Sequence, residues 1–129
     1  MAQAPEQIPE TLWIEEEVYR LFTAPLAPWL RAHDLAFEHR SEACARGYIG
    51  RWKIATGALW LIDLHGWIDG RLVRVPDLFD GAAEIRADWY SGDIVFEPPP
   101  DTVEEGAMAR QQRVYIDSGA IRRSRPAPG

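Results

Sequence analysis

Apolar and polar residues alternate between positions 46 and 64, which predicts a β-hairpin with the sequence RGYIGRWKI-ATG-ALWLIDL. On its first strand Tyr48, Trp52 and Ile54 share one face. The second strand is apolar at nearly every position, as in a strand covered on both sides. A three-residue loop, Ala55-Thr56-Gly57, fits the connection. The expected register sets Ile54 opposite Ala58, Trp52 opposite Trp60, Gly50 opposite Ile62 and Tyr48 opposite Leu64, with Trp60 packed inward.

Three later stretches are also expected to form hairpins. Residues 67–73 place Asp69-Gly70 between apolar pairs, which is a strong turn signal. Residues 84–97 carry Ser91-Gly92 as a two-residue loop, and this pairing would set Trp89 against Ile94 and Ala87 against Phe96. Residues 113–123 are expected to turn at Asp117-Ser118-Gly119.

Residues 12–22 admit two interpretations. Ile14, Val18, Leu21 and Phe22 fit the apolar stripe of a helix, and the intervening glutamates favour helix formation. Strand formers on both sides of a short polar centre indicate a hairpin instead. We prefer the hairpin.

The remaining segments predict little regular structure. The prolines at 25 and 28 favour a turn and a short helix through residues 29–31, and Pro76 to Asp80 predicts a turn or a single helical turn. Residues 101–109 are expected to form a loop, and residues 1–10 and 124–129 loose arms, around one domain (1–129) with a core at about 11–123. We therefore expect a mainly β (α+β) fold. Its antiparallel sheet of hairpins would form a partly open barrel or a sandwich, with one or two short helices.

Composition and cysteine usage narrow the class of protein. With 129 residues the chain is one domain that needs no metal or disulfide to fold, and its single cysteine, Cys44, excludes an internal disulfide. The N-terminus lacks the pattern of a signal peptide, and the longest apolar run, Ala58 to Ile62, is too short to span a membrane. These features predict a cytoplasmic protein.

Charge is distributed unevenly along the chain. Residues 110–129 hold five arginines and one aspartate, which gives this segment a net charge of +4. Since the whole chain has a net charge of −6, residues 1–109 have a net charge of −10. So acidic a body repels nucleic acid and anionic membranes and steers towards a basic protein partner. Simple solubility explains the same charge equally well.

Candidate chemistry is sparse. His33, His39, His65 and Cys44 show no short metal-ligand spacing, and nothing near Cys44 activates it as a nucleophile. Abundant carboxylates on strands could form an acid–base pair but are also expected on any solvent-exposed face. Phosphate-binding, dinucleotide-binding and nucleophile-elbow motifs are absent from the sequence. The sequence therefore indicates no catalytic residue, no metal and no cofactor.

Six tryptophans are more than so small a core can hide, and we expect Trp67 to be the most exposed. The partner-binding residues predicted around it are Asp63, Trp67, Asp69, Asp88, Tyr90 and Asp93. Trp67 covering one end of the core is an equally good explanation. An alternative pocket within a curled sheet would be lined by Tyr48, Trp52, Asp63, His65 and Trp89.

The run RGYIGRWKIATGALWLIDL, followed by LF at 78–79 and ADWYSGDI at 87–94, resembles a group of small bacterial proteins of uncharacterised function. The likeness covers about residues 10–97, including PLAPWL at 25–30. Members of that group have an asparagine-glycine type of turn where this chain has Glu15-Glu16-Glu17, which favours the hairpin over residues 12–22. The resemblance supports the topology and implies no activity.

The function that these features favour is that of a non-enzymatic binding protein, of the immunity or inhibitor kind, which masks a basic surface on another protein. The alternative is a small-molecule binder or enzyme with a pocket in the curled sheet. Self-association into a homodimer through edge strands is a third possibility.

Overall fold

The computed structural model describes residues 9–39, 47–98 and 111–122. The fold is mainly β with two short helices, as the sequence predicted. The expected loop at 101–109 and the tail at 124–129 lie outside the described residues, whereas Glu10, assigned to the N-terminal arm, is the first residue of a strand. Neither described helix is long and apolar enough to cross a membrane.

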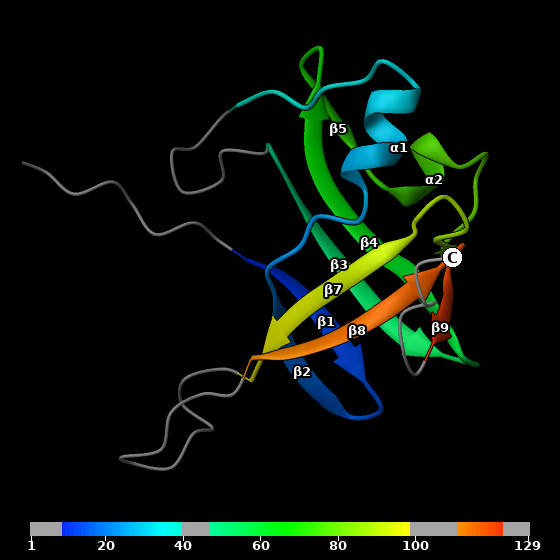
Figure 1. Ribbon diagram of the computed structural model, residues 1–129. Coiled ribbons are helices and arrows are strands. Elements are labelled where there is room, and N and C mark those ends of the chain that lie inside the picture. Colours follow the sequence, from blue (N-terminus) through cyan, green and yellow to red (C-terminus); the bar gives the residue numbers. More distant parts are fainter. Residues whose placement is uncertain (1–8, 40–46, 99–110, 123–129) are drawn as a thin grey trace, which may run out of the picture.

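The elements follow one another in an order dominated by hairpins (Figure 1). The bounds are β1 Glu10–Ile14, β2 Glu17–Leu21, α1 Ala27–Ala32, β3 Tyr48–Ala55, β4 Ala58–Ile68, β5 Arg71–Val73, α2 Val75–Leu78, β6 Ile85–Arg86, β7 Gly92–Glu97, β8 Gln112–Asp117 and β9 Ala120–Arg122.

Seven of the described strands close into a barrel in the order β3-β1-β2-β7-β8-β9-β4, and the pairing of β3 with β4 completes the ring. Strands β5 and β6 add to β4 outside the ring. All described pairings are antiparallel except that of β1 with β3, which is parallel and which the hairpin pattern did not predict. Of the two architectures expected, the barrel is therefore the one formed, and it is closed.

The β3–β4 hairpin differs from its predicted register. Its loop has two residues, Thr56 and Gly57, both with positive φ (53° and 71°), so Ala55 pairs with Ala58. Two consecutive positive φ angles make the tight turn whose twist matches that of the strands. A β-bulge next to Trp52 then shifts the pairing again towards the base of the hairpin.

The shifted register changes which side chains enter the barrel. Trp52 lies opposite Leu61, and Leu59 and Leu61 are fully buried. Because side chains alternate along a strand, Trp60 lies on the outer face, where its Nε1–H donates to the Ala55 carbonyl at 3.1 Å. The prediction that Trp60 packs inward was wrong.

The predicted hairpin over residues 84–97 is also wrong. Strand β6 pairs with β4 instead, and β7 pairs with β2 and β8, so Trp89 does not face Ile94 across a ladder. The segment between β6 and β7 turns back on itself, with the Tyr90 N–H bonded to the Ala87 carbonyl at 3.0 Å. The local pattern was that of a strand pair, but long-range partners were available to both strands.

The other hairpins are confirmed. Strands β1 and β2 meet at Glu15-Glu16, β4 and β5 at Asp69-Gly70, and β8 and β9 at Ser118-Gly119. Pro25 precedes α1 and Pro28 is the second residue of that helix, and residues 75–78 form the single helical turn α2. Both helices lie at the end of the barrel from which β4 and β5 extend, opposite the β1–β2 turn (Figure 1).

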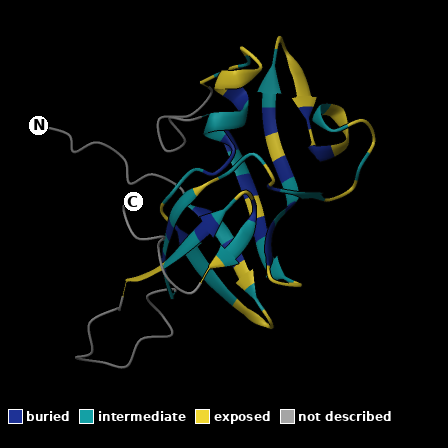
Figure 2. Cartoon of the chain, turned by 45° about the vertical axis from the view of Figure 1, so that its right-hand side comes forward, coloured by how far each residue is buried: buried dark blue, intermediate teal, exposed yellow. Residues whose placement is uncertain are grey.

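Large apolar side chains fill the barrel interior, so the buried residues follow the inner faces of the strands while the exposed residues collect at turns and helix surfaces (Figure 2). One carboxylate, Glu10, is buried among them with 2% exposure and accepts a hydrogen bond from Trp52 Nε1 at 3.1 Å. A Cβ at position 50 would overlap the Glu10 carboxylate, so any residue other than glycine there requires Glu10 to move. The fully buried core side chains are Leu12, Leu26, Trp52, Leu59, Leu61, Leu64, Ala87, Ile94 and Ile116.

Candidate functional site

Arginines neutralise three of the carboxylates predicted to meet a basic partner. Asp63 pairs with Arg74 at 2.6 Å, Asp88 with Arg86 at 3.3 Å, and Asp93 with Arg113 at 3.1 Å. Partial burial opposes the charge on Asp63, but the Arg74 and backbone hydrogen bonds and the nearby arginines outweigh it and lower its pKa. Paired carboxylates of this kind contribute little attraction for a partner.

The other residues of that predicted surface come from two segments. Trp67 is half-buried on β4, with its ring 6.5 Å from that of His65, and Asp69 occupies the β4–β5 turn. Tyr90 follows β6 and donates to the Asp93 carbonyl at 2.7 Å; burial and the Asp93 charge raise its pKa. The most exposed tryptophan is Trp13, at 37%, rather than Trp67.

The alternative pocket residues are divided between the barrel interior and the outer face of β4. Tyr48 and Trp52 are buried in the core, and Trp89 packs near Trp52 with ring centroids 6.5 Å apart. Asp63 and His65 lie on the outer face of β4, and His65 is exposed. The strand therefore separates the two groups, because inward and outward side chains alternate along it.

The structure instead places an acidic aromatic surface at the β1–β2 hairpin. We call it the hairpin surface; it consists of Trp13, Glu15, Glu16, Glu17, Val18 and Tyr19. Trp13 pairs across the strands with Val18, and the three glutamates are exposed at and beside the turn. A groove of about 680 Å³ runs along it, bordered further by Pro98 and Gln112.

The hairpin surface is electrostatically negative. Among the described residues, Glu15, Glu16 and Glu17 make no ion pair. Glu17 accepts a hydrogen bond from Tyr19 Oη at 2.7 Å, and this bond, burial and the charges of Glu17 and Glu15 together raise the pKa of Tyr19. On the other side of β1 the register partner of Trp13 is Lys53 of β3, whose Nζ forms an ion pair with Glu84 rather than with a hairpin glutamate.

Sequence reasoning passed over this surface although its signal was present. The run Glu15-Glu16-Glu17 was weighed only as helix-forming residues or as a turn. Trp13 is the neighbour of Leu12, and consecutive side chains of a strand point to opposite faces. Because Leu12 is buried, Trp13 lies on the outer face. Assigning a hairpin to residues 12–22 and asking which side chains lie on its outer face would have found both Trp13 and the acidic turn.

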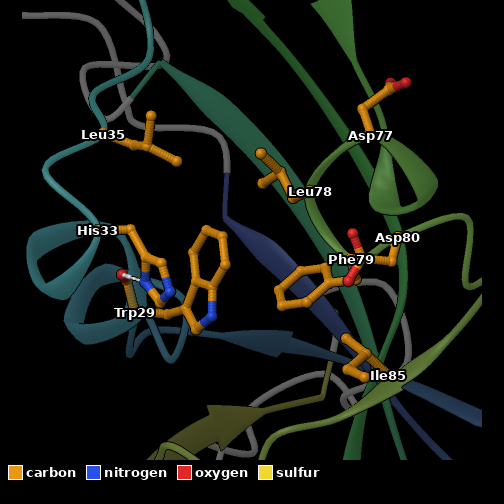
Figure 3. Close-up of a pocket in the computed structure, with 8 residues that line it drawn as sticks. All are labelled: Trp29, His33, Leu35, Asp77, Leu78, Phe79, Asp80 and Ile85. Atoms are coloured by element: carbon orange, nitrogen blue, oxygen red, sulfur yellow. Dashed lines mark hydrogen bonds between the residues drawn. The ribbon is translucent and has the colours of Figure 1, made fainter.

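A second hollow, the α1–α2 pocket, lies between the two helices (Figure 3). Its volume is about 540 Å³, and its lining residues are Trp29, His33, Leu35, Asp77, Leu78, Phe79, Asp80 and Ile85. Asp77 and Asp80 make no ion pair within the described part of the chain, and Asp77 accepts a hydrogen bond from the Arg74 backbone N–H at 2.7 Å.

Aromatic rings from three distant segments hold this pocket in place. His33 stacks on Trp29 with centroids 4.0 Å apart and an interplanar angle of 22°, and Phe79 lies 4.6 Å from Trp29. Phe79 in turn stacks on Trp89 at 5.5 Å, and Trp89 Nε1 donates to the Pro25 carbonyl at 2.7 Å. The series of rings connects the exposed His33 to the barrel core.

Neither surface offers an evident metal site. In residues 9–39, 47–98 and 111–122, no three histidine, cysteine or acidic side chains lie close enough to hold a metal ion. Cys44 is outside the described residues.

No family model, curated protein or solved structure matches the chain.

Proposed function

We propose that this protein is a non-enzymatic cytoplasmic binding protein, of the immunity or inhibitor kind, that masks a basic surface of another protein through the hairpin surface. The observation that carries the proposal is an exposed tryptophan on the same hairpin as three glutamates that form no ion pair with a described basic side chain. Exposed aromatic anchors contribute strongly to binding energy, and unpaired carboxylates steer a cationic partner.

The setting of Trp13 supports this role over a purely structural one. Its side chain is 37% exposed although the barrel interior beneath β1 is already filled by Leu12 and other core residues. More than a third of Trp13 therefore stays in contact with water in the isolated chain. Covering Trp13 with a partner would remove that apolar area from water.

The paired carboxylates provide a contrast within the same molecule. Asp63, Asp88 and Asp93 each have an arginine within 3.3 Å, whereas the three hairpin glutamates have none among the described residues. A partner's lysines or arginines at the hairpin would therefore meet carboxylates that no cation of the described residues already pairs with.

The test is affinity capture with the full chain as bait, followed by binding measurements on the purified partner. Trp13→Ala and the triple change of Glu15, Glu16 and Glu17 to Gln should each release the partner, and about 0.5 M salt should do so as well by screening. Phe22→Ala is the matched control, because Phe22 is 50% exposed near the other end of β2 and lies under the Arg20 guanidinium.

A captured protein with a basic surface that both hairpin variants lose and Phe22→Ala retains would support the proposal. Capture that ignores Trp13, the glutamates and salt would overturn it.

A further inference from the structure

We propose that the α1–α2 pocket binds a small neutral molecule through a carboxamide edge, that is, a carbonyl oxygen beside an N–H donor on a flat apolar body. This site is separate from the hairpin surface, and the inference does not depend on the proposed protein partner.

The first element is a hydrogen-bond acceptor with a defined tautomer. His33 Nδ1 lies 2.8 Å from the Trp29 carbonyl oxygen, and a carbonyl can only accept, so Nδ1 carries the proton. In the neutral ring Nε2 is then an acceptor. No described group donates to Nε2, which leaves it available to a ligand N–H.

The second element is a donor beside it. The indole N–H groups of Trp52, Trp60 and Trp89 each donate to a protein oxygen, at 3.1, 3.1 and 2.7 Å. The Trp29 N–H, by contrast, makes no hydrogen bond to a described residue, and Trp29 is half-buried at the pocket wall, so its indole still lacks a protein acceptor. A ligand carbonyl would supply it.

Stacking brings the donor and the acceptor together. The His33 and Trp29 rings are nearly parallel and 4.0 Å apart, and Figure 3 shows the Trp29 indole nitrogen and the second His33 nitrogen on the same side of the stack. Phe79 packs against Trp29 and limits its movement. A donor and an acceptor side by side on rigid supports match the two atoms of an amide edge.

The other residues that line the pocket favour an uncharged ligand with an apolar ring. Leu35, Leu78 and Ile85 provide apolar walls, and a volume of about 540 Å³ is within the range of small-molecule sites. Asp80, drawn beside Phe79 in Figure 3, disfavours a carboxylate, while the Trp29 donor gives no benefit to a simple cation. A neutral amide satisfies both constraints.

The test titrates benzamide and N,N-dimethylbenzamide into the ¹⁵N-labelled full chain while the indole N–H resonances are followed by NMR. Benzamide should shift the Trp29 indole signal to saturation. The dimethyl compound keeps the carbonyl and loses the N–H donors, so it should bind about tenfold more weakly, the effect of one hydrogen bond. Benzoate should bind more weakly than benzamide because of Asp80.

A matched pair of variants assigns the acceptor. His33→Phe keeps a ring stacked on Trp29 but removes Nε2, so benzamide and its dimethyl analogue should bind it equally. His65→Phe changes an exposed histidine outside the pocket and should leave the difference intact.

Equal affinities of the two amides for the wild-type protein would overturn the inference. So would a Trp29 signal that benzamide leaves unmoved at its solubility limit, or shifts confined to Trp13. These wild-type results decide the question even if His33→Phe fails to fold.

Discussion

The hairpin surface and the α1–α2 pocket both combine an aromatic side chain with carboxylates that form no ion pair with a described residue, but they hold the aromatic ring differently. Trp13 stands on the outer face of β1, 37% exposed and without a described ring neighbour. Trp29 lies between His33 and Phe79, which cover its faces and leave its edge to the pocket. An open ring face suits a large partner, whereas a ring clamped by its neighbours presents fixed donor and acceptor atoms to a small one.

Stability should separate the two tryptophans most strongly. Trp29→Ala removes the ring that joins His33 to Phe79 and should cost about 3 kcal/mol of unfolding free energy, as large-to-small changes in packed sites do. Trp13→Ala should change it by no more than about 0.5 kcal/mol. Urea denaturation of the two variants measures both values, and equal losses would remove the distinction between clamped and free rings.

Partner affinity should show the reverse order. Trp13→Ala should weaken binding of the captured partner by about 2 kcal/mol, roughly thirtyfold, because it removes the aromatic anchor. Trp29→Phe, a milder change at the other end, should leave that affinity unaltered. Isothermal titration calorimetry with the purified partner compares the two affinities. A greater loss of affinity from Trp29→Phe would show that the partner binds near the α1–α2 pocket and not at the hairpin surface.

Glu15 in the turn of the hairpin surface should lower the stability of the fold while its charge strengthens partner binding. Glu15 has a φ of 57°, a left-handed conformation that glutamate tolerates less well than asparagine does. Glu15→Asn should therefore raise the unfolding free energy by about 0.5 kcal/mol while lowering partner affinity. The pocket aspartate Asp80, with a φ of 52°, is the control, since Asp80→Asn should leave partner affinity unchanged. A destabilised Glu15→Asn variant would show that the glutamate is structurally preferred there.

The smallest effect is expected at a paired carboxylate. The folded-state pKa of Asp63 is lowered, so its contribution to stability is present above the unfolded-state value of about 3.9 and is lost as the pH falls through the folded-state pKa. Asp63→Asn should cost only about 0.3 kcal/mol at neutral pH because the pair is partly exposed, and it should cost nothing once the carboxyl is protonated. Denaturation midpoints across this acidic range measure the difference; a cost that persists after protonation would assign it to packing.

Local chemistry made several elements readable in advance. The Asp69-Gly70 and Ser118-Gly119 turns, and the helix with Pro28 in its first turn, depend on conformations available to a few adjacent residues. The hairpin at residues 12–22 was harder, because its glutamates suit a helix equally well. Of the candidate site, the acidic run and Trp13 were visible in the sequence, but which acids lack an arginine was not.

By itself, then, the sequence determined the mainly β class, most of the hairpins and the short helices, because turn residues and alternation act over a few neighbouring positions. Barrel closure through the parallel β1–β3 pair, the partners of β6 and β7, and the bulge beside Trp52 came from tertiary contacts. So did the exposure of Trp13 and the clamping of Trp29. Each of these features joins residues far apart in the chain, whose preferences become effective only when packing brings them together.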